Sequence, residues 1–187
     1  DGFNSHIPRL MDFPFELSIL IGFKNTTDLW DGGMMKIYKT LTQDFVYDSP
    51  NTSLVIFADN HDLKRIYTEF GRSLPKVKMA MTLVSTMRGI PQIYYGTELL
   101  FENDPRGQGF LLYDQCRTDF PGGWPGDSVN LFLDKDRKPD QREMFNHVRT
   151  LLHFRKNNPV VYNGKFMHFI PRNNMYTYFR YDNKECV

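Results

Sequence analysis

The sequence has little of several features that would point to particular classes of protein. Its two cysteines, Cys116 and Cys186, are too few for a disulfide framework or a cysteine-ligated zinc site. Lysine and arginine number 23 against 22 aspartates and glutamates, so there is no basic excess of the kind that nucleic-acid-binding surfaces show. No apolar run approaches the roughly 20 residues needed to cross a bilayer. We therefore expect neither nucleic acid nor a membrane as a partner.

The length also excludes one architecture. A complete (β/α)₈ barrel takes about 250 residues, and this chain has 187. What the chain has in plenty is aromatic side chains, which make up 15% of it with 16 Phe and 10 Tyr. Its hydrophobic fraction of 41% and charged fraction of 24% are those of an ordinary globular protein.

Three apolar runs predict strands. Residues 9–13 form a short run that Pro14 closes, and residues 90–95 form another that ends at a glycine. Between them, residues 54–58 are apolar without alternation, which suits a strand buried on both faces of a parallel sheet. We expect these three runs to be strands of one parallel sheet.

Helical spacing fills the gaps between the predicted strands. Apolar residues recur on one helical face over 34–45 and again over 73–89. A third helix is expected from Asp140, which together with Glu143 resembles a capping box, to a point near Pro159. After that the period changes, because residues 165–170 and 175–181 flank Pro-Arg-Asn-Asn and predict a hairpin. The order predicts parallel α/β units followed by the beginning of an all-β domain.

The sharpest candidate for chemistry is Asn60-His61-Asp62, directly after the second predicted strand. Polar groups at the carboxyl end of a parallel strand face the crevice in which α/β proteins bind ligands. They could hydrogen-bond a polyhydroxylated substrate, and the carboxylate could stabilise developing positive charge. The alternative is a plain loop in which Asp62 caps the following segment and His61 packs beside it.

The long stretch from Glu102 to Asp127, rich in Gly, Pro and Asp, is the second candidate, because loops of this length are usually functional. Within it, Trp124 stands among prolines and glycines and could be a platform for a sugar. The alternative is a packed loop whose Trp124 covers the core.

Together these segments resemble the α-amylase family of glycoside hydrolases. Phe57–Asp62 is similar to the family's Phe-x-x-Asn-His-Asp motif after the seventh barrel strand, Gly89–Glu98 to its eighth-strand motif, and Met11–Pro14 to its sixth strand. The segments Asp119–Trp124 and Arg155–Pro159 resemble the cyclomaltodextrinase and neopullulanase branch. The resemblance implies the C-terminal portion of a (β/α)₈ barrel over residues 1–158, with strands six to eight, and the start of an antiparallel β domain over residues 159–187.

The family implies retaining hydrolysis of α-glucosidic bonds in α-glucan oligosaccharides. The nucleophile and the acid/base of such an enzyme follow strands four and five, which this chain does not show, so we expect the chain alone to be inactive. Asp62 corresponds to the third carboxylate, which stabilises the transition state, and His61 to a donor to the same sugar. Arg65 is expected to orient these two groups or to bind the substrate, and Asp104 and Trp124 are expected to contact the substrate.

The resemblance implies no cofactor in this chain, allows calcium in the parent enzyme, and suggests a periplasmic or secreted location. Two other functions stay open: a carbohydrate-binding or degenerate fragment without catalysis, and a glucanotransferase of the same family. Because a partial barrel leaves an open parallel edge, we also expect the chain either to form homo-oligomers through that edge or to pack it in a non-native way.

Overall fold

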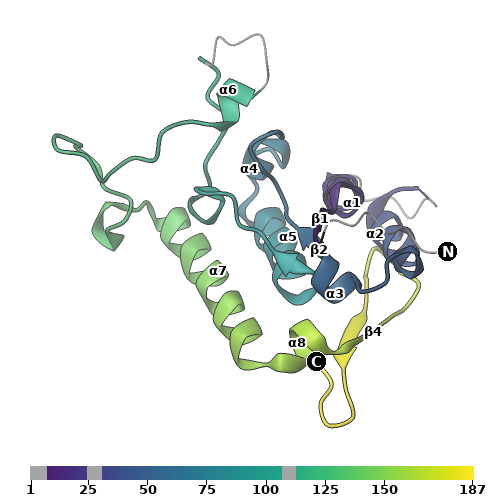
Figure 1. Ribbon diagram of the computed structural model, residues 1–187. Coiled ribbons are helices and arrows are strands. Elements are labelled where there is room, and N and C mark those ends of the chain that lie inside the picture. The colour runs from purple at the N-terminus through teal and green to yellow at the C-terminus, as the bar shows by residue number, and fades with distance from the viewer. Residues whose placement is uncertain (1–7, 25–30, 107–112) are drawn as a thin grey trace.

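The computed structural model describes residues 8–24, 31–106 and 113–187. Figure 1 shows the strands in the middle of the molecule with helices around them and the C-terminal hairpin at one side. In chain order the elements are β1 (Leu10–Met11), α1 (Phe13–Lys24), α2 (Gly33–Leu41), the 3₁₀ helix η1 (Asp44–Val46), α3 (Pro50–Ser53), β2 (Leu54–Ile56), α4 (Ile66–Glu69), α5 (Leu74–Thr86), β3 (Ile90–Pro91), the 3₁₀ helix η2 (Thr97–Leu99), α6 (Tyr113–Cys116), the 3₁₀ helix η3 (Asp134–Asp136), α7 (Pro139–Asn157), α8 (Pro159–Asn163), β4 (Lys165–His168) and β5 (Tyr178–Tyr181).

The three N-terminal strands form a parallel sheet in the order β1-β2-β3, as predicted. In its central strand, Leu54 and Ile56 point to one face and are buried, whereas Val55 on the other face is only partly buried, so that face is less covered than expected. The outer strands are shorter than expected. The third begins at Ile90 as predicted but ends at Pro91, which has no N–H for the ladder, and one further bond from Gln92 N to Ile56 O (2.8 Å) continues the pairing.

Helix α1 was not expected from the sequence. Pro14, which the sequence predicts to close a strand, stands in the first turn of this helix, where its missing N–H costs nothing. Asp12 begins the helix by accepting a hydrogen bond from Phe15 N at its Oδ1 (3.0 Å). The next helix, α2, is shorter than the predicted 34–45, and Phe45 lies beyond it with 84% of its surface exposed.

The two long helices α5 and α7 lie side by side, with α5 between α7 and the sheet (Figure 1). The predicted apolar stripe of α5 is fully buried. The predicted capping box of α7 is wrong, because the helix begins one residue before Asp140, after Lys138. There Gln141 Oε1 accepts a hydrogen bond from Lys138 N (3.0 Å), and Glu143 instead forms an ion pair with Lys78 of α5 (2.9 Å).

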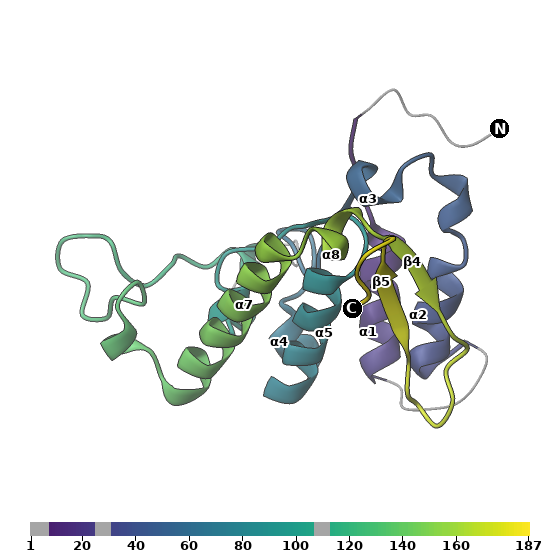
Figure 2. The ribbon, with the colours of Figure 1, turned by 90° about the horizontal axis from the view of Figure 1, so that it is seen from below.

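The C-terminal hairpin forms as predicted, with β4 and β5 antiparallel and Lys165 opposite Tyr181. Asn173 and Asn174 adopt the left-handed conformation that the turn requires. Figure 2 shows the hairpin beside α1 and α2. A hydrogen bond of 2.6 Å between Tyr178 Oη and Thr86 Oγ1 joins it to α5.

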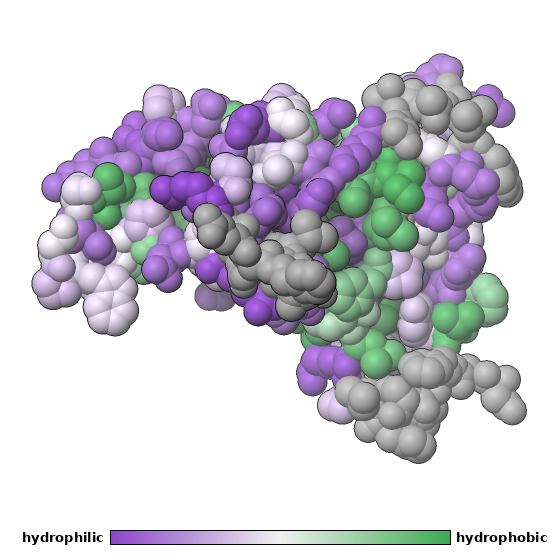
Figure 3. Space-filling model, turned by 90° about the horizontal axis from the view of Figure 1, so that it is seen from above, coloured by the Kyte–Doolittle hydropathy of each residue, from purple (hydrophilic) through white to green (hydrophobic). Residues whose placement is uncertain are grey.

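The surface is uneven in hydropathy. Figure 3 shows apolar atoms gathered on the side where α1 lies, and hydrophilic atoms over most of the opposite end. Met11, Phe13 and Leu17, at the edge strand β1 and the start of α1, are large apolar residues with more than a third of their surface exposed. Among the described residues, no helix is both long and apolar enough to pass through a membrane.

Candidate functional site at the end of strand β2

The turn after β2 is built by two buried polar residues. Asp59 accepts hydrogen bonds from Ile66 N at Oδ2 (3.0 Å) and from Thr97 Oγ1 at Oδ1 (2.7 Å). Asn60 Oδ1 accepts a hydrogen bond from Asp62 N (2.8 Å). The capping role that the plain-loop alternative gave to Asp62 is therefore wrong, because Asp59 caps α4 and Asn60 closes the turn. The carboxylate of Asp62 is left for other contacts.

His61 and Asp62 present their side chains at the surface. Their exposed fractions are 59% and 46%, and His61 Nε2 lies 3.4 Å from Asp62 Oδ2. A carboxylate and an imidazole that are adjacent and open to solvent can accept from and donate to neighbouring sugar hydroxyls. The structure thus brings together the two residues that the sequence singled out first.

Sequence reasoning missed Arg117. Its Nη2 donates to Asp62 Oδ1 (3.0 Å), and its Nε donates to the backbone oxygen of His61 (2.9 Å). These contacts join residues 55 and 56 positions apart in the sequence. No spacing rule connects them, so the sequence held no signal by which Arg117 could be found.

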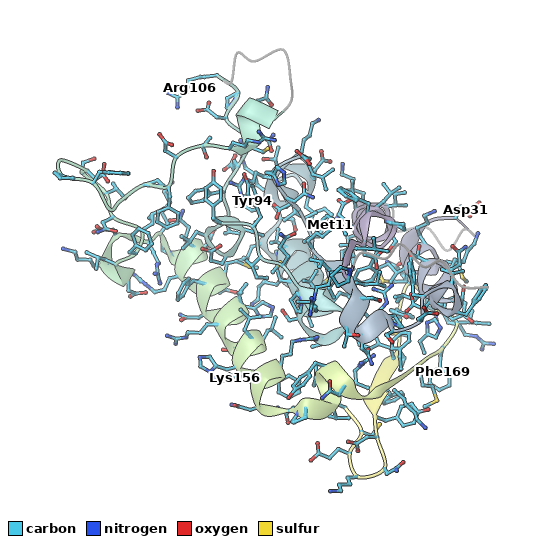
Figure 4. The ribbon with its side chains drawn as sticks, viewed as in Figure 1. Met11, Asp31, Tyr94, Arg106, Lys156 and Phe169 are labelled. Carbon is cyan, nitrogen blue, oxygen red and sulfur yellow. The ribbon has the colours of Figure 1, made fainter. Side chains whose placement is uncertain are left out.

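The segment Gln115–Thr118 that carries Arg117 is itself fixed by three hydrogen bonds. Gln115 O accepts from Asp104 N (2.8 Å). Cys116 O accepts from Tyr94 Oη (3.4 Å), and Thr118 O accepts from Tyr95 Oη (2.6 Å). Burial, followed by the adjacent Tyr95, raises the pKa of Tyr94 to about 12, so its hydroxyl keeps the proton that it donates. Figure 4 shows the labelled Tyr94 on the side of the molecule that faces α6.

Arg65 is fully buried under this segment. Its guanidinium carbon lies 4.0 Å from the centre of the Tyr94 ring and 4.8 Å from that of Tyr95, and its Nη1 donates to Tyr95 O (2.6 Å). The sequence analysis expects Arg65 to orient His61 and Asp62, whereas these contacts are with Tyr94 and Tyr95. The expected contact of Arg65 with a substrate is wrong, because this side chain has no exposed surface.

Asp104 and Trp124 lie further along the loop. Asp104 forms an ion pair with Arg106 (2.9 Å), whose side chain is 88% exposed and which Figure 4 labels next to α6. This ion pair and the accompanying hydrogen bonds lower the pKa of Asp104. Trp124 is 78% exposed, so the alternative in which it covers the core is wrong. Figure 1 shows its loop, between α6 and η3, extending away from the sheet, and Trp124 is not brought to His61 and Asp62.

A metal site was not expected in this chain. The described ranges contain no group of three or more histidine, cysteine, aspartate and glutamate side chains that could hold a metal ion.

The parallel strands and their connecting helices fit part of a (β/α)₈ barrel, a fold in which active sites lie at the carboxyl ends of the strands. Residues 4–116 match the family model described as "Alpha amylase, catalytic domain". Because the match covers more than half of the chain, the chain belongs to the α-amylase family. Residues 166–187 match the model described as "Cyclo-malto-dextrinase C-terminal domain".

Curated relatives include Alpha-amylase 3 of Dictyoglomus thermophilum, 28% identical over 170 residues, which are 85% of this chain and 33% of the relative. A cyclomaltodextrin glucanotransferase of Thermoanaerobacterium thermosulfurigenes is 28% identical over 91% of this chain and 20% of its own length. The chain therefore spans a third or less of these relatives.

Solved structures show the same fold. An α-amylase from H. orenii matches with a TM-score of 0.67 and 25% identity over 96% of this chain and 38% of its own. AmyP E221Q in complex with maltotriose matches with a TM-score of 0.75 and 17% identity over 99% of this chain and 40% of its own. These matches confirm the expected C-terminal portion of a (β/α)₈ barrel.

Proposed function

We propose that this chain is the C-terminal part of a retaining hydrolase of α-glucosidic bonds, in which Asp62 stabilises the transition state. Such a reaction passes through an oxocarbenium-like transition state that carries positive charge on the sugar ring. A carboxylate beside the ring stabilises that charge, and His61 donates to a hydroxyl of the same sugar. The nucleophile and the acid/base belong to strands four and five of the complete barrel.

The observation that supports this proposal best is that the four polar residues of the turn after β2 fall into two pairs with different roles. Asp59 and Asn60 are buried and hold the turn, whereas His61 and Asp62 are exposed side by side at the carboxyl end of the strand. A residue with a purely structural role would use its carboxylate as Asp59 does. Asp62 instead presents one oxygen toward the His61 ring and solvent.

The substrate class follows from the names of the relatives, which include a maltogenic α-amylase of Bacillus acidopullulyticus and cyclomaltodextrin glucanotransferases. We propose α-glucan oligosaccharides, linear or cyclic, as the substrate. The same names favour one alternative, in which the glucosyl group passes to another sugar and not to water. Products formed from maltotriose distinguish the two, because transfer gives chains longer than the substrate and hydrolysis gives only shorter ones.

Three further expectations remain parts of this proposal. The barrel part ends at residue 158 and the all-β domain begins at 159, where Asn158 separates α7 from α8. The apolar edge around Met11, Phe13 and Leu17 contacts either the remaining barrel strands or a second copy of the chain. The complete enzyme is periplasmic or secreted. Calcium, which the resemblance allows in the parent, has no step in this mechanism.

The test is Asp62→Asn in a full-length protein that contains this chain. We expect kcat on maltooligosaccharides to fall by about a hundredfold or more, with the melting temperature nearly unchanged. The matched control is Asp134→Asn, because Asp134 is also an exposed aspartate paired with an arginine, Arg142 (3.0 Å), and lies outside the site. Near-normal turnover in Asp62→Asn would overturn the proposal.

The 187-residue chain alone provides a second test. Without the strands that carry the nucleophile and the acid/base, we expect it to release no reducing sugar from maltooligosaccharides. Release above that of an Asp62→Asn control would show that the catalytic pair lies within this chain and would overturn the assignment.

A further inference from the structure

We propose that Arg117 is a positioning residue for Asp62, and this inference rests on the proposed function of Asp62. Arg117 would not touch the sugar. It would act by holding the carboxylate in the orientation that the transition state requires.

The geometry suits an arginine in particular. Nε of Arg117 donates to His61 O (2.9 Å), while Nη2 of the same guanidinium donates to Asp62 Oδ1 (3.0 Å). A planar guanidinium has donors fixed in a fork and can bind two acceptors at once, whereas an ammonium acts as a point charge. The fork therefore fixes both the backbone of His61 and the side chain of Asp62.

The contact with Arg117 engages one oxygen of Asp62 and leaves the other oxygen for substrate. Oδ1 accepts from Arg117 and keeps a further lone pair, whereas Oδ2 lies on the side of His61 Nε2 at 3.4 Å. An exposed aspartate without such a partner would exchange among rotamers and pay an ordering cost when the sugar binds. The ion pair removes part of that cost in advance, which is what preorganisation of a charge-stabilising group means.

The segment around Arg117 is rigid enough for this task. Tyr94, Tyr95 and Asp104 each bind one of its backbone oxygens, and Arg65 holds the two tyrosine rings from below. A second contact reinforces the first, because Cys116 Sγ lies 3.4 Å from the same oxygen of His61. The segment that carries Arg117 is thus fixed to Tyr94 and Tyr95, which follow β3, and this places Arg117 beside the turn after β2.

The experiment is a double-mutant cycle on a full-length protein that contains this chain, with wild type, Asp62→Asn, Arg117→Met and the double variant. Turnover is read from an aryl maltooligosaccharide with a chromogenic leaving group. We expect Arg117→Met to lower kcat roughly 10- to 100-fold, with a smaller change in KM, because misplacing a group by about 1 Å can cost a hundredfold. In the Asp62→Asn background the same change should cost less than about twofold, since residues that act through one another are not additive.

Two further variants complete the design. Arg117→Lys keeps the charge but not the fork, and we expect an intermediate loss of kcat. Arg142→Met is the matched control, because Arg142 is also a part-exposed arginine that binds the carboxylate and the backbone oxygen of one aspartate, Asp134. Arg142→Met should keep wild-type kcat. Arg117→Lys also serves as the test if Arg117→Met does not fold.

The outcomes separate this inference from the proposed function. A loss that is equally large with and without the Asp62 carboxylate would overturn the positioning role. A gain of activity in Arg117→Met would overturn it too, since Arg117 would then be shielding Asp62 from substrate. Wild-type activity in Asp62→Asn would overturn the proposed function itself, and the role of Arg117 with it.

Discussion

Nη1 of Arg88 lies 2.7 Å from Oδ2 of Asp12, and each of these side chains is only 2% exposed. The same guanidinium also binds both carboxylate oxygens of Asp44, each at 2.6 Å. Burial alone would lower the pKa of Arg88, but the two carboxylates outweigh it and raise the pKa. One buried cation thereby joins the residue after β1, the 3₁₀ helix η1 and the loop before β3.

We expect Arg88→Met to destabilise the fold by about 3–5 kcal/mol, because removing one partner of a buried ion pair leaves the other charges uncompensated. The free energy of unfolding in urea measures this change. Lys78→Met is the control, since its ion pair with Glu143 lies at the surface and should contribute no more than about 1 kcal/mol. Equal effects of the two substitutions would contradict the argument.

The raised pKa of Glu16 predicts how the free energy of unfolding depends on pH. Burial, and then the nearby carboxylates of Asp59 and Glu69, raise the pKa of Glu16 from 4.5 to about 7. Between these values the folded chain keeps a proton that the unfolded chain has released. The free energy of unfolding should therefore fall as pH rises from about 4.5 to about 7, by about 3 kcal/mol in total from this group.

Glu16→Gln should remove this part of the pH dependence and give a protein more stable than wild type at pH 8. Urea unfolding of both proteins at several pH values between 5 and 8 tests it. Glu143→Gln, which changes an exposed glutamate, should leave the slope as it is in wild type. A Glu16→Gln protein with the wild-type slope would show that another group titrates.

The sequence correctly predicts those parts of the fold that follow from the spacing of its apolar residues and from its turn residues. Four of the five residues in the apolar run at 54–58 and the whole stripe of α5 are buried, and the turn between β4 and β5 falls at Asn173 and Asn174. It failed at α1, because Pro14 is compatible with the end of a strand and with the first turn of a helix. The contact of Asp12 with Phe15 N decides between the two, and it is a local N-cap contact that Asp12 followed by Pro14 already indicates in the sequence.

The residues of the candidate site likewise fall into those that the sequence reveals and those that it does not. His61 and Asp62 could be found because they directly follow a buried strand. Arg117 could not, since its contacts with them close only after the loop from Glu102 returns to β2. Arg65 shows a third case, in which the residue was found but its burial against Tyr94 and Tyr95 was not. Long-range contacts of this kind leave no local pattern.

The hydrogen bonds of Arg155 stabilise the chain at the end of α5, so its substitution should lower the free energy of unfolding. Its guanidinium donates to the backbone oxygens of Ser85 (3.1 Å), Met87 (2.9 Å) and Gly89 (2.5 Å). Burial lowers the pKa of Arg155 to about 10, so the side chain stays charged at neutral pH.

Arg155→Met should cost about 3 kcal/mol in the free energy of unfolding, because it leaves buried carbonyl groups without donors. The neighbouring Lys156→Met should cost less than about 0.5 kcal/mol, since Figure 4 shows Lys156 pointing outward from α7. Urea unfolding of the two variants compares them. A similar loss in both would show that the effect comes from helix charge and not from the three carbonyl contacts.

Two glycines, Gly96 and Gly126, allow the cost of backbone strain to be measured separately from the cost of steric overlap. Gly96 and Gly126 have φ angles of +85° and +95°, a region that other residues adopt only at a cost. A Cβ at Gly96 would overlap the ring of Phe101, which lies beside Tyr95, whereas a Cβ at Gly126 would meet nothing within 4 Å. Gly126→Ala should therefore cost about 1 kcal/mol, and Gly96→Ala a further 1–3 kcal/mol or so from overpacking. Equal losses on urea unfolding would mean that Phe101 can move away freely and that Gly96 is needed only for its backbone angle.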